Sequence, residues 1–289
     1  MYKKAYGIIE TLAPLHIGAS AGEESGNLNL IFRDQFTQTG IIPGSSIRGR
    51  FRADMRQDPR QKNEGYKDYN YWYGQEAPEK GVADEDKKDT TEAQVKFEYA
   101  SIVWLPVYCP SQPVVWVSCP RLLKRYQKLS GKPIYDFKPH TYYGAKDNID
   151  TLFFNLGFIC LDSRDQELGK YIPDKLENLK AGRDLVLVVS DTEISMIHDM
   201  ALYRQSRVAL DRNEKKATGG AFFNVEALPE GTILTFPTAI KNKGKDDNSW
   251  QEYIADADIK KTKELYFGGL ESIGFGRTNV TLYEGNIKE

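Results

Sequence analysis

The hydrophobic and polar positions at the start of the chain first alternate and then recur with a spacing of four. Residues 4–13 alternate polar with apolar side chains, which predicts a strand, and residues 27–33 form a second extended segment. Ile47, Phe51 and Met55 then recur at every fourth position, so we predict a helix that buries these three side chains along one face. The first part of the chain therefore combines strands with a helix.

The start of this helix carries residue types that suit an anion. Pro43 and Gly44 break the chain, and Ser45 or Ser46 is expected to cap the helix by accepting a hydrogen bond from a free N–H group. Free N–H groups, the helix dipole and guanidinium groups all favour phosphate. A surface helix whose arginines are only solvated is the alternative. The arginines beside the apolar stripe are Arg48, Arg52 and Arg56.

A second basic helix is predicted after a hairpin. Residues 97–119 contain two β-branched and aromatic runs separated by a proline-containing turn, and a helix begins after Pro120. No acidic residue occurs in the stretch 110–135, which makes it the clearest local positive patch in the sequence. An ordinary solvated helix face is the alternative. The basic residues that share one face of this helix are Arg121, Lys124, Arg125 and Lys128.

The later segments predict strands, a projecting hairpin and loops. Residues 183–190 form a strand, and the basic, aromatic stretch 203–235 with its Gly-Gly break fits a long hairpin. The charged residues 76–94 are expected to form a mobile loop. A glycine-rich loop, 268–276, leads into a last strand and lets its backbone approach another backbone closely. It lacks the Gly-Lys-Ser/Thr ending of a phosphate-binding loop, so we do not expect nucleotide hydrolysis.

Composition limits the class of protein. The 39 Lys and Arg residues nearly balance 41 Asp and Glu residues, so any nucleic-acid surface must be a local patch. Three cysteines without CxxC spacing predict buried thiols in a reducing cytoplasm, with no zinc site or disulfide framework. No run reaches transmembrane length, so we expect no membrane partner. Among the few histidines, His16 at a strand end is a candidate general base or phosphate contact; an ordinary hydrogen-bonded histidine is the alternative.

Four segments together resemble a known family. They are LHIGA at 15–19, RDQFTQTGIIPGSSIRGRFR at 33–52, VWVSCPRLLKRYQK at 115–128 and GGLESIGFGRTNV at 268–280. In this order they are similar to the RAMP-type backbone subunits of type III CRISPR effector complexes. The segments 116–127 and 219–232 are more similar to the Cmr (type III-B) subunit than to its Csm counterpart.

The resemblance implies a single RAMP domain over residues 1–289. Its fold would be α+β, a modified ferredoxin-like (RRM-type) core with lid loops and a thumb hairpin inserted at 200–235. Copies would stack along a guide CRISPR RNA beside other type III subunits, while the thumb parts guide from target RNA. Phosphate contacts would be independent of sequence and need no cofactor. The residues implied in RNA binding are His16, Ser45, Ser46, Arg48, Arg50, Arg52, Arg204, Arg207, Gly268, Gly269 and Arg277.

One departure from the family concerns cleavage of target RNA. Active members carry an aspartate five residues before the arginine that Arg33 matches, which is Leu28 here; counting forward from His16 gives Asn27. Neither side chain is an acid, and a neutral amide is a poor base and a weak magnesium ligand. We therefore expect a subunit that holds RNA without cutting it.

Three alternatives remain at this point. The first is Mg²⁺-dependent slicing of target RNA by Glu23, Glu24 or Asn27 in place of the aspartate. The second is metal-independent processing of guide RNA by His16. The third, suggested by the aromatic content, is a β-rich domain that binds carbohydrate or another small ligand.

Overall fold

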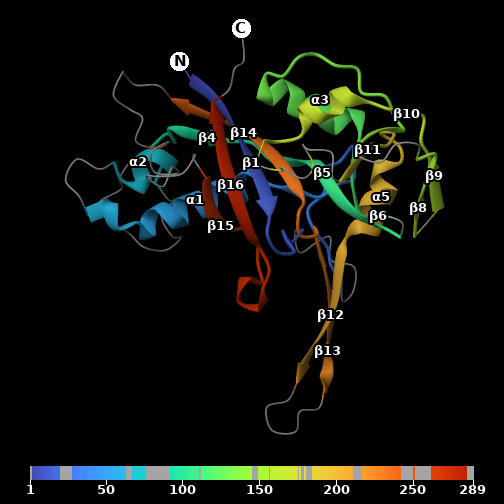
Figure 1. Cartoon of the computed structure of the whole chain (residues 1–289). Coiled ribbons are helices and arrows are strands. Elements are labelled where there is room, and N and C mark those ends of the chain that lie inside the picture. Colours follow the sequence, from blue (N-terminus) through green and yellow to red (C-terminus); the bar gives the residue numbers. More distant parts are fainter. Residues whose placement is uncertain are drawn as a thin grey trace.

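A large mixed sheet organises the chain, and helices cover both of its faces (Figure 1). The computed structural model describes residues 2–19, 28–62, 67–75, 91–110, 112–144, 149–155, 157–174, 176, 179, 184–210, 217–241, 250 and 262–284. In spatial order, the strands of the large sheet are β10 (Ser163–Arg164), β7 (Thr141–Tyr143), β11 (Leu185–Val188), β6 (Gln112–Ser118), β5 (Ala100–Cys109), β14 (Ile233–Lys241), β1 (Tyr2–Thr11), β16 (Arg277–Glu284) and β15 (Thr262–Tyr266), with β3 (Ile41–Ile42) on β5 and β4 (Val95–Phe97) on β14.

Two smaller sheets and several helices complete the described fold. The smaller sheets contain β12 (Tyr203–Leu210), β13 (Ala217–Ala227) and β2 (Leu28–Asn29), and separately β8 (Thr151–Phe154) and β9 (Gly157–Cys160). The helices are α1 (Gly44–Gln57), α2 (Tyr69–Tyr73), α3 (Pro120–Ser130) and α5 (Ile194–Ala201), with short 3₁₀ turns η1 (Pro59–Lys62), η2 (Gln166–Tyr171) and η3 (Glu271–Ile273). This is an α+β arrangement, as predicted.

The central strand β1 separates two hydrophobic cores. It pairs antiparallel with β14 on one side and β16 on the other. Because successive side chains of a strand point to opposite faces, Ile9 joins the core that contains Phe51 of α1, while Ile8 joins the core that contains Leu123 of α3. Helices α1 and α3 therefore cover opposite faces of the sheet.

The predicted helix α1 is confirmed, but its predicted cap is wrong. Ile47, Phe51 and Met55 are fully buried, as their spacing predicts. The N-cap is Pro43, and no side chain caps the helix. The Pro43 carbonyl accepts hydrogen bonds from the N–H groups of Ser46 and Ile47, so both serines lie inside the first turn. A Cβ on Gly44 would meet the Phe97 carbonyl oxygen, which explains why glycine begins the helix there.

The hairpin and basic helix predicted in the middle of the chain are also present. Strands β5 and β6 pair antiparallel, with Leu105 opposite Val117. Helix α3 follows at Pro120 and ends at Gly131, whose positive φ of 66° is the conformation that glycine supplies at a helix C-terminus. The strand predicted at 183–190 is β11, which pairs parallel with β6.

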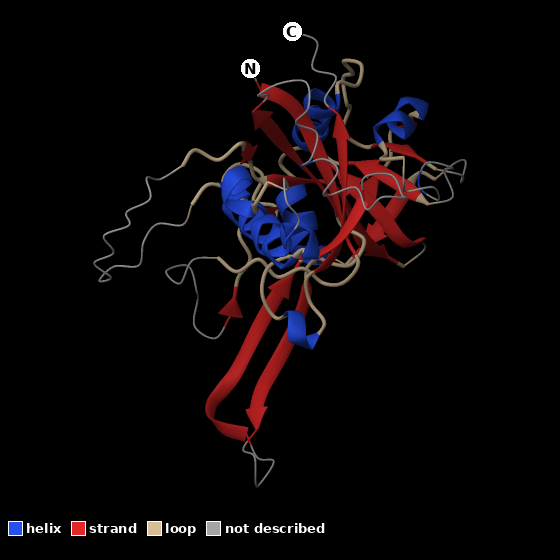
Figure 2. Cartoon of the chain, turned by 90° about the vertical axis from the view of Figure 1, so that its left-hand side faces the viewer, coloured by secondary structure: helices blue, strands red, loops and turns tan. Residues whose placement is uncertain are grey.

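The stretch 203–235 contains the predicted hairpin. Strands β12 and β13 pair antiparallel and extend away from the body of the protein (Figures 1 and 2). The short strand β2 adds to β13 in parallel, with Leu28 opposite Asn224 and Asn29 opposite Val225. Residues 211–216 at the tip, and residues 76–90 of the predicted mobile loop, lie outside the described residues.

Two composition-based expectations have different outcomes. Cys109 and Cys119 are buried thiols, as predicted, whereas Cys160 is exposed, so the prediction for Cys160 is wrong. Cys160 lies on β9, which pairs only with β8 among the described strands and therefore has no second layer to bury it. Within the described part of the chain, no helix is long and apolar enough to cross a membrane.

Candidate nucleic-acid interface

The glycine-rich loop 268–276, which we call the glycine loop, lies directly against the segment that contains His16. The N–H of Gly269 donates to the His16 carbonyl oxygen at 3.2 Å, and the N–H of Gly276 donates to the Pro14 carbonyl oxygen at 2.9 Å. Gly268 has a φ of +80°, and a Cβ there would overlap the His16 carbonyl oxygen. The sequence predicted such a close backbone approach, and these contacts confirm it.

The glycine loop also packs on the base of the projecting hairpin. The ring centroids of Phe275 and Tyr203 are 5.9 Å apart in an edge-on arrangement. Phe275 also shares a small hydrophobic cluster with Val225 and Ala227 of β13. We call this contact between the loop and the base of β12 and β13 the loop–hairpin junction. It joins two segments that the sequence analysis had assigned separately to RNA binding.

A buried carboxylate anchors the hairpin base. Glu226 is 2% exposed, and it accepts hydrogen bonds at 3.1 Å from both Arg33 and Arg204. Arg33 also contacts Asp199 at 2.5 Å. Arg204, predicted to contact RNA, is thus held by the protein itself, although its side chain remains 49% exposed. Sequence reasoning did not identify Glu226 because its partner Arg33 is 193 positions away.

His198 lies beside this cluster in a neutral state. Its Nε2 accepts a hydrogen bond from the Gly40 N–H at 2.9 Å, so the proton of the neutral ring is on Nδ1, 3.7 Å from Asp199. Burial lowers the pKa of His198 below its usual 6.5. The His198 ring and Arg33 in turn lower the pKa of Asp199 to about 2. The cluster is therefore built for a neutral histidine and an ionised aspartate.

We expect the stability of the protein to fall as the pH drops below about 6.5, the usual histidine pKa. In that range His198 binds a proton in the unfolded state that the folded state excludes, because its pKa is lower in the folded protein. The free energy of unfolding therefore decreases as the pH falls below the usual histidine pKa and is fully retained at higher pH. Urea unfolding at pH 7.5 and 5.5 measures this difference. His198→Gln should be less stable at pH 7.5 but show a smaller pH dependence; an equal dependence in both proteins would contradict the assignment.

The α1 arginines are divided between the protein interior and the glycine loop. Arg48 donates to the Tyr73 carbonyl oxygen. Arg52 is 7% exposed and donates to Asn70 at 2.8 Å, so both arginines hold α2 against α1. Arg50 instead points across to the glycine loop, where it lies 3.7 Å from Glu271. RNA contact by Arg48 and Arg52 stays a prediction, and their contacts with α2 give both a structural role.

The other predicted residues differ in their accessibility. His16 is 8% exposed, and its Nδ1 donates to the Glu226 carbonyl oxygen at 2.7 Å, so it joins the segment after β1 to the hairpin base. Arg207 lies over the Phe223 ring at 5.5 Å on the hairpin. Arg277 is exposed at the start of β16 and has no side-chain partner among the residues that the structure describes. The surface open to a ligand includes Ser45, Gly269 and Arg277.

Two positions, Leu28 and Asn27, could correspond to the expected catalytic acid. The structure describes only Leu28, which is apolar. Leu28 is half-buried on β2 beside the hairpin. Asn27, Glu23 and Glu24 lie outside the described residues. Within the described part of the chain, no group of three or more His, Cys, Asp or Glu side chains is placed to hold a metal ion. The described residues around Leu28 therefore do not fit a magnesium site.

Comparisons with known proteins agree with this architecture. The model of the RAMP superfamily matches residues 8–279. No curated protein sequence shows a significant match. Similar solved structures include a type III-B Cmr-beta chain in its apo state, with 17% identity, a TM-score of 0.71 and coverage of 99% of both chains. A chain of the Cmr-beta complex bound to cognate target RNA has 18% identity, a TM-score of 0.70 and coverage of 96% of both chains.

Oligomeric Cmr4 from Pyrococcus furiosus shares the same fold. Its identity is 17% and its TM-score 0.66, with 98% of this chain and 99% of that chain covered. Because the identities are low, these structures establish the fold alone. Membership of the family rests on the family model, which matches nearly the whole sequence. With its large mixed sheet, projecting hairpin and closing glycine loop, this chain belongs to the RAMP superfamily.

Proposed function

We propose that this chain is a guide-RNA-binding backbone subunit of a type III-B (Cmr) antiviral ribonucleoprotein, which positions guide and target RNA. The observation that carries the proposal is the loop–hairpin junction, where Phe275 of the glycine loop packs on the hairpin base. Gly269 in the same loop and Arg277, two residues after Phe275, are both exposed. A similar fold occurs in a complex bound to cognate target RNA, which supports the same assignment.

The proposed contacts hold the RNA backbone and leave its bases to pair. Glycine in the loop lets a phosphate come close to the main chain, and a guanidinium such as that of Arg277 binds phosphate oxygens with several donors. On the hairpin, Arg207 and Phe223 combine a cation with an aromatic ring, which suits separation of stacked nucleotides. Such contacts would not depend on nucleotide sequence, because base pairing with the guide reads the target.

The finer architecture belongs to the same proposal. We infer a modified ferredoxin-like core around β1, with β12 and β13 as an inserted thumb. Several copies would stack along the guide beside other effector subunits in the cytoplasm, and the oligomeric Cmr4 relative supports self-association. Electron microscopy of the assembled complex tests this part. A single copy of this chain, or copies that do not contact the guide RNA, would contradict it.

We further propose that the subunit holds target RNA without cutting it. Holding RNA requires no metal, and Mg²⁺ would be needed only for cleavage. The support for this is Leu28, an apolar residue where slicing members are expected to carry an acid. Regular Mg²⁺-dependent cuts in a guide-matched target would contradict it.

Arg277→Ala is expected to weaken binding of guide-length RNA about ten-fold, since a hydrogen bond to a charged group contributes about 1.5 kcal/mol. The loss should be similar for unrelated RNA sequences, and the salt dependence should become shallower by about 0.7 in the log–log slope. Fluorescence anisotropy at several salt concentrations measures both quantities. Lys138→Ala, an exposed cation on the segment after α3, is the matched control. A loss confined to one RNA sequence would argue against backbone contact.

A further inference from the structure

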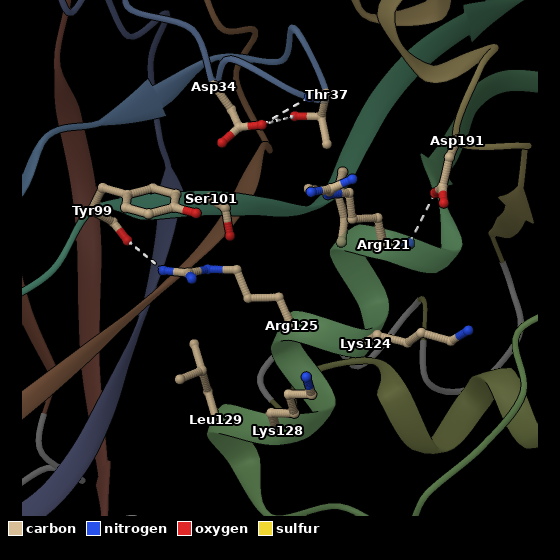
Figure 3. Close-up of a pocket in the computed structure, with 11 residues that line it drawn as sticks. Asp34, Thr37, Tyr99, Ser101, Arg121, Lys124, Arg125, Lys128, Leu129 and Asp191 are labelled. Carbon is tan, nitrogen blue, oxygen red and sulfur yellow. Dashed lines mark hydrogen bonds between the residues drawn. The ribbon is translucent and has the colours of Figure 1, made fainter.

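The basic face of α3 lines a cleft that the proposed interface does not use. The cleft has a volume of about 460 Å³ and lies between α3, the start of β5 and the loop that contains Asp34 and Thr37 (Figure 3). The cleft lies on the face of the sheet that α3 covers, opposite the face that α1 covers. The cations that line it are Arg121, Lys124, Arg125 and Lys128.

The two carboxylates at the cleft do not neutralise these cations. Asp34 accepts hydrogen bonds from the N–H of Phe36 at 3.0 Å and of Thr37 at 2.8 Å, and so closes its own turn. Asp191 accepts the backbone N–H of Arg121 at 2.9 Å. Lys128 has no side-chain partner in the described part of the chain. Lys124 and Arg125 have longer contacts, 3.8 Å to Asp136 and 3.9 Å to Glu98, but both of these carboxylates are largely exposed, so the pairs are weak. The cleft lining itself holds four cations and two carboxylates, so it keeps a local positive charge in a protein whose net charge is −2.

Two buried donors at the cleft lack acceptors. Ser101 is 2% exposed, and its hydroxyl has no hydrogen-bond partner in the described structure. The Nε of Arg125 is likewise buried and unpartnered, although another nitrogen of the same guanidinium donates to the Tyr99 carbonyl oxygen at 3.1 Å. Figure 3 shows the Ser101 hydroxyl turned into the space beside Arg125. Because buried donors without acceptors are costly and uncommon, these two favour a bound group that is rich in acceptor oxygens.

Aromatic rings at the cleft indicate the kind of anion. The Arg125 guanidinium lies 4.1 Å from the centroid of the Tyr99 ring, and Arg121 lies 4.7 Å from that of Phe36. Phe36 is 72% exposed, which is unusual for a phenylalanine side chain. Cations together with an exposed aromatic ring are typical of single-stranded nucleic-acid sites, where bases stack on the ring. An acidic peptide would use the cations but not the ring.

We propose that this cleft binds a single-stranded RNA segment as a second site, separate from the loop–hairpin junction. A phosphate would accept hydrogen bonds from Ser101 and Arg125 and pair with Lys128, while Phe36 stacks on an adjacent base. The proposal does not require the junction to bind RNA, since none of its residues lines the cleft.

The test uses the full-length protein and a fluorescein-labelled oligouridylate, with affinity measured by anisotropy at several salt concentrations. Lys124→Ala/Lys128→Ala should weaken binding at least ten-fold and reduce the salt slope by about 1.4, which corresponds to two phosphate contacts on a single strand. Lys138→Ala/Lys170→Ala removes the same charge from exposed positions outside the cleft and should leave affinity within two-fold (about a 0.4 kcal/mol limit).

Ser101→Ala separates binding from folding. It removes a buried hydroxyl without a partner, so its thermal midpoint should not fall, while affinity for the oligouridylate should drop several-fold. If Ser101→Ala and the cleft double variant match the control, the proposal is overturned. It is also overturned, in favour of an acidic protein segment, if oligoglutamate competes as well as RNA and loses affinity in the same variants. If Arg277→Ala leaves RNA binding unchanged, the result contradicts RNA binding at the loop–hairpin junction. It does not bear on the proposal for the cleft.

Discussion

Gly268→Ala is expected to destabilise the protein by about 3 kcal/mol, the sum of strain at a positive φ and overlap with a backbone atom. The φ of Gly268 is +80°, and its added Cβ would collide with the His16 carbonyl oxygen, which cannot rotate away as a side chain would. Because that carbonyl also accepts the Gly269 N–H, the substitution should open the contact between the glycine loop and the segment that contains His16. Urea unfolding measures the loss, and RNA affinity should fall with it.

Two neighbouring glycines separate the causes. Gly269 has no atom within 4 Å of its added Cβ, so Gly269→Ala should leave stability within about 0.5 kcal/mol. Gly274 has a φ of +94° but also open space, so Gly274→Ala should cost about 1 kcal/mol from strain alone. If Gly268→Ala costs no more than Gly274→Ala, the loop can move away from His16, and the close packing is not required.

Arg33→Ala is expected to destabilise the protein by about 3 kcal/mol, because removing one partner of a buried ion pair leaves charge uncompensated. Arg33 bridges Glu226 and Asp199, and the Glu226 side chain is only 3% exposed. Arg204 alone would then neutralise Glu226 from a half-exposed position. The hairpin base should loosen, which faster amide hydrogen exchange in β12 and β13 would show.

A double-mutant cycle tests whether the lost charge balance is the cause. Glu226→Gln in the Arg33→Ala background removes the uncompensated carboxylate, so the double variant should be more stable than the sum of the single losses predicts. Arg50→Ala is the comparison, since Arg50 has similar exposure but pairs at 3.7 Å with Glu271, a carboxylate that is 44% exposed. It should cost under about 1 kcal/mol. Additive losses in the cycle would show that Arg33 acts through packing alone.

Local patterns predicted the elements whose burial follows from nearby residues. The spacing of Ile47, Phe51 and Met55 identified α1, because one face of a helix is a local property. The β-branched runs at 97–119 identified β5 and β6 for the same reason. The serine cap was wrong because the helix begins at Gly44, so the cap position is Pro43, two residues before Ser45 and three before Ser46.

The candidate site could be predicted only as separate pieces. The sequence marked the glycine loop, the hairpin and the α1 arginines, but it could not show that the loop packs on the hairpin through Phe275. It also could not show which arginines are held by the protein itself, because Arg48 and Arg52 contact α2, a helix that the sequence did not predict. Glu226 resembles any strand glutamate until its distant partners are known. These contacts depend on long-range topology.

The pairing of β2 with β13 connects Leu28 directly to the base of the projecting hairpin. Asn224 and Val225 are bonded to β2, and the next residue, Glu226, holds Arg33, so three successive positions tie one strand to the segment that precedes α1. We therefore expect a ligand that bends the hairpin to displace Leu28 and Arg33 as well, because both segments are bonded to β13.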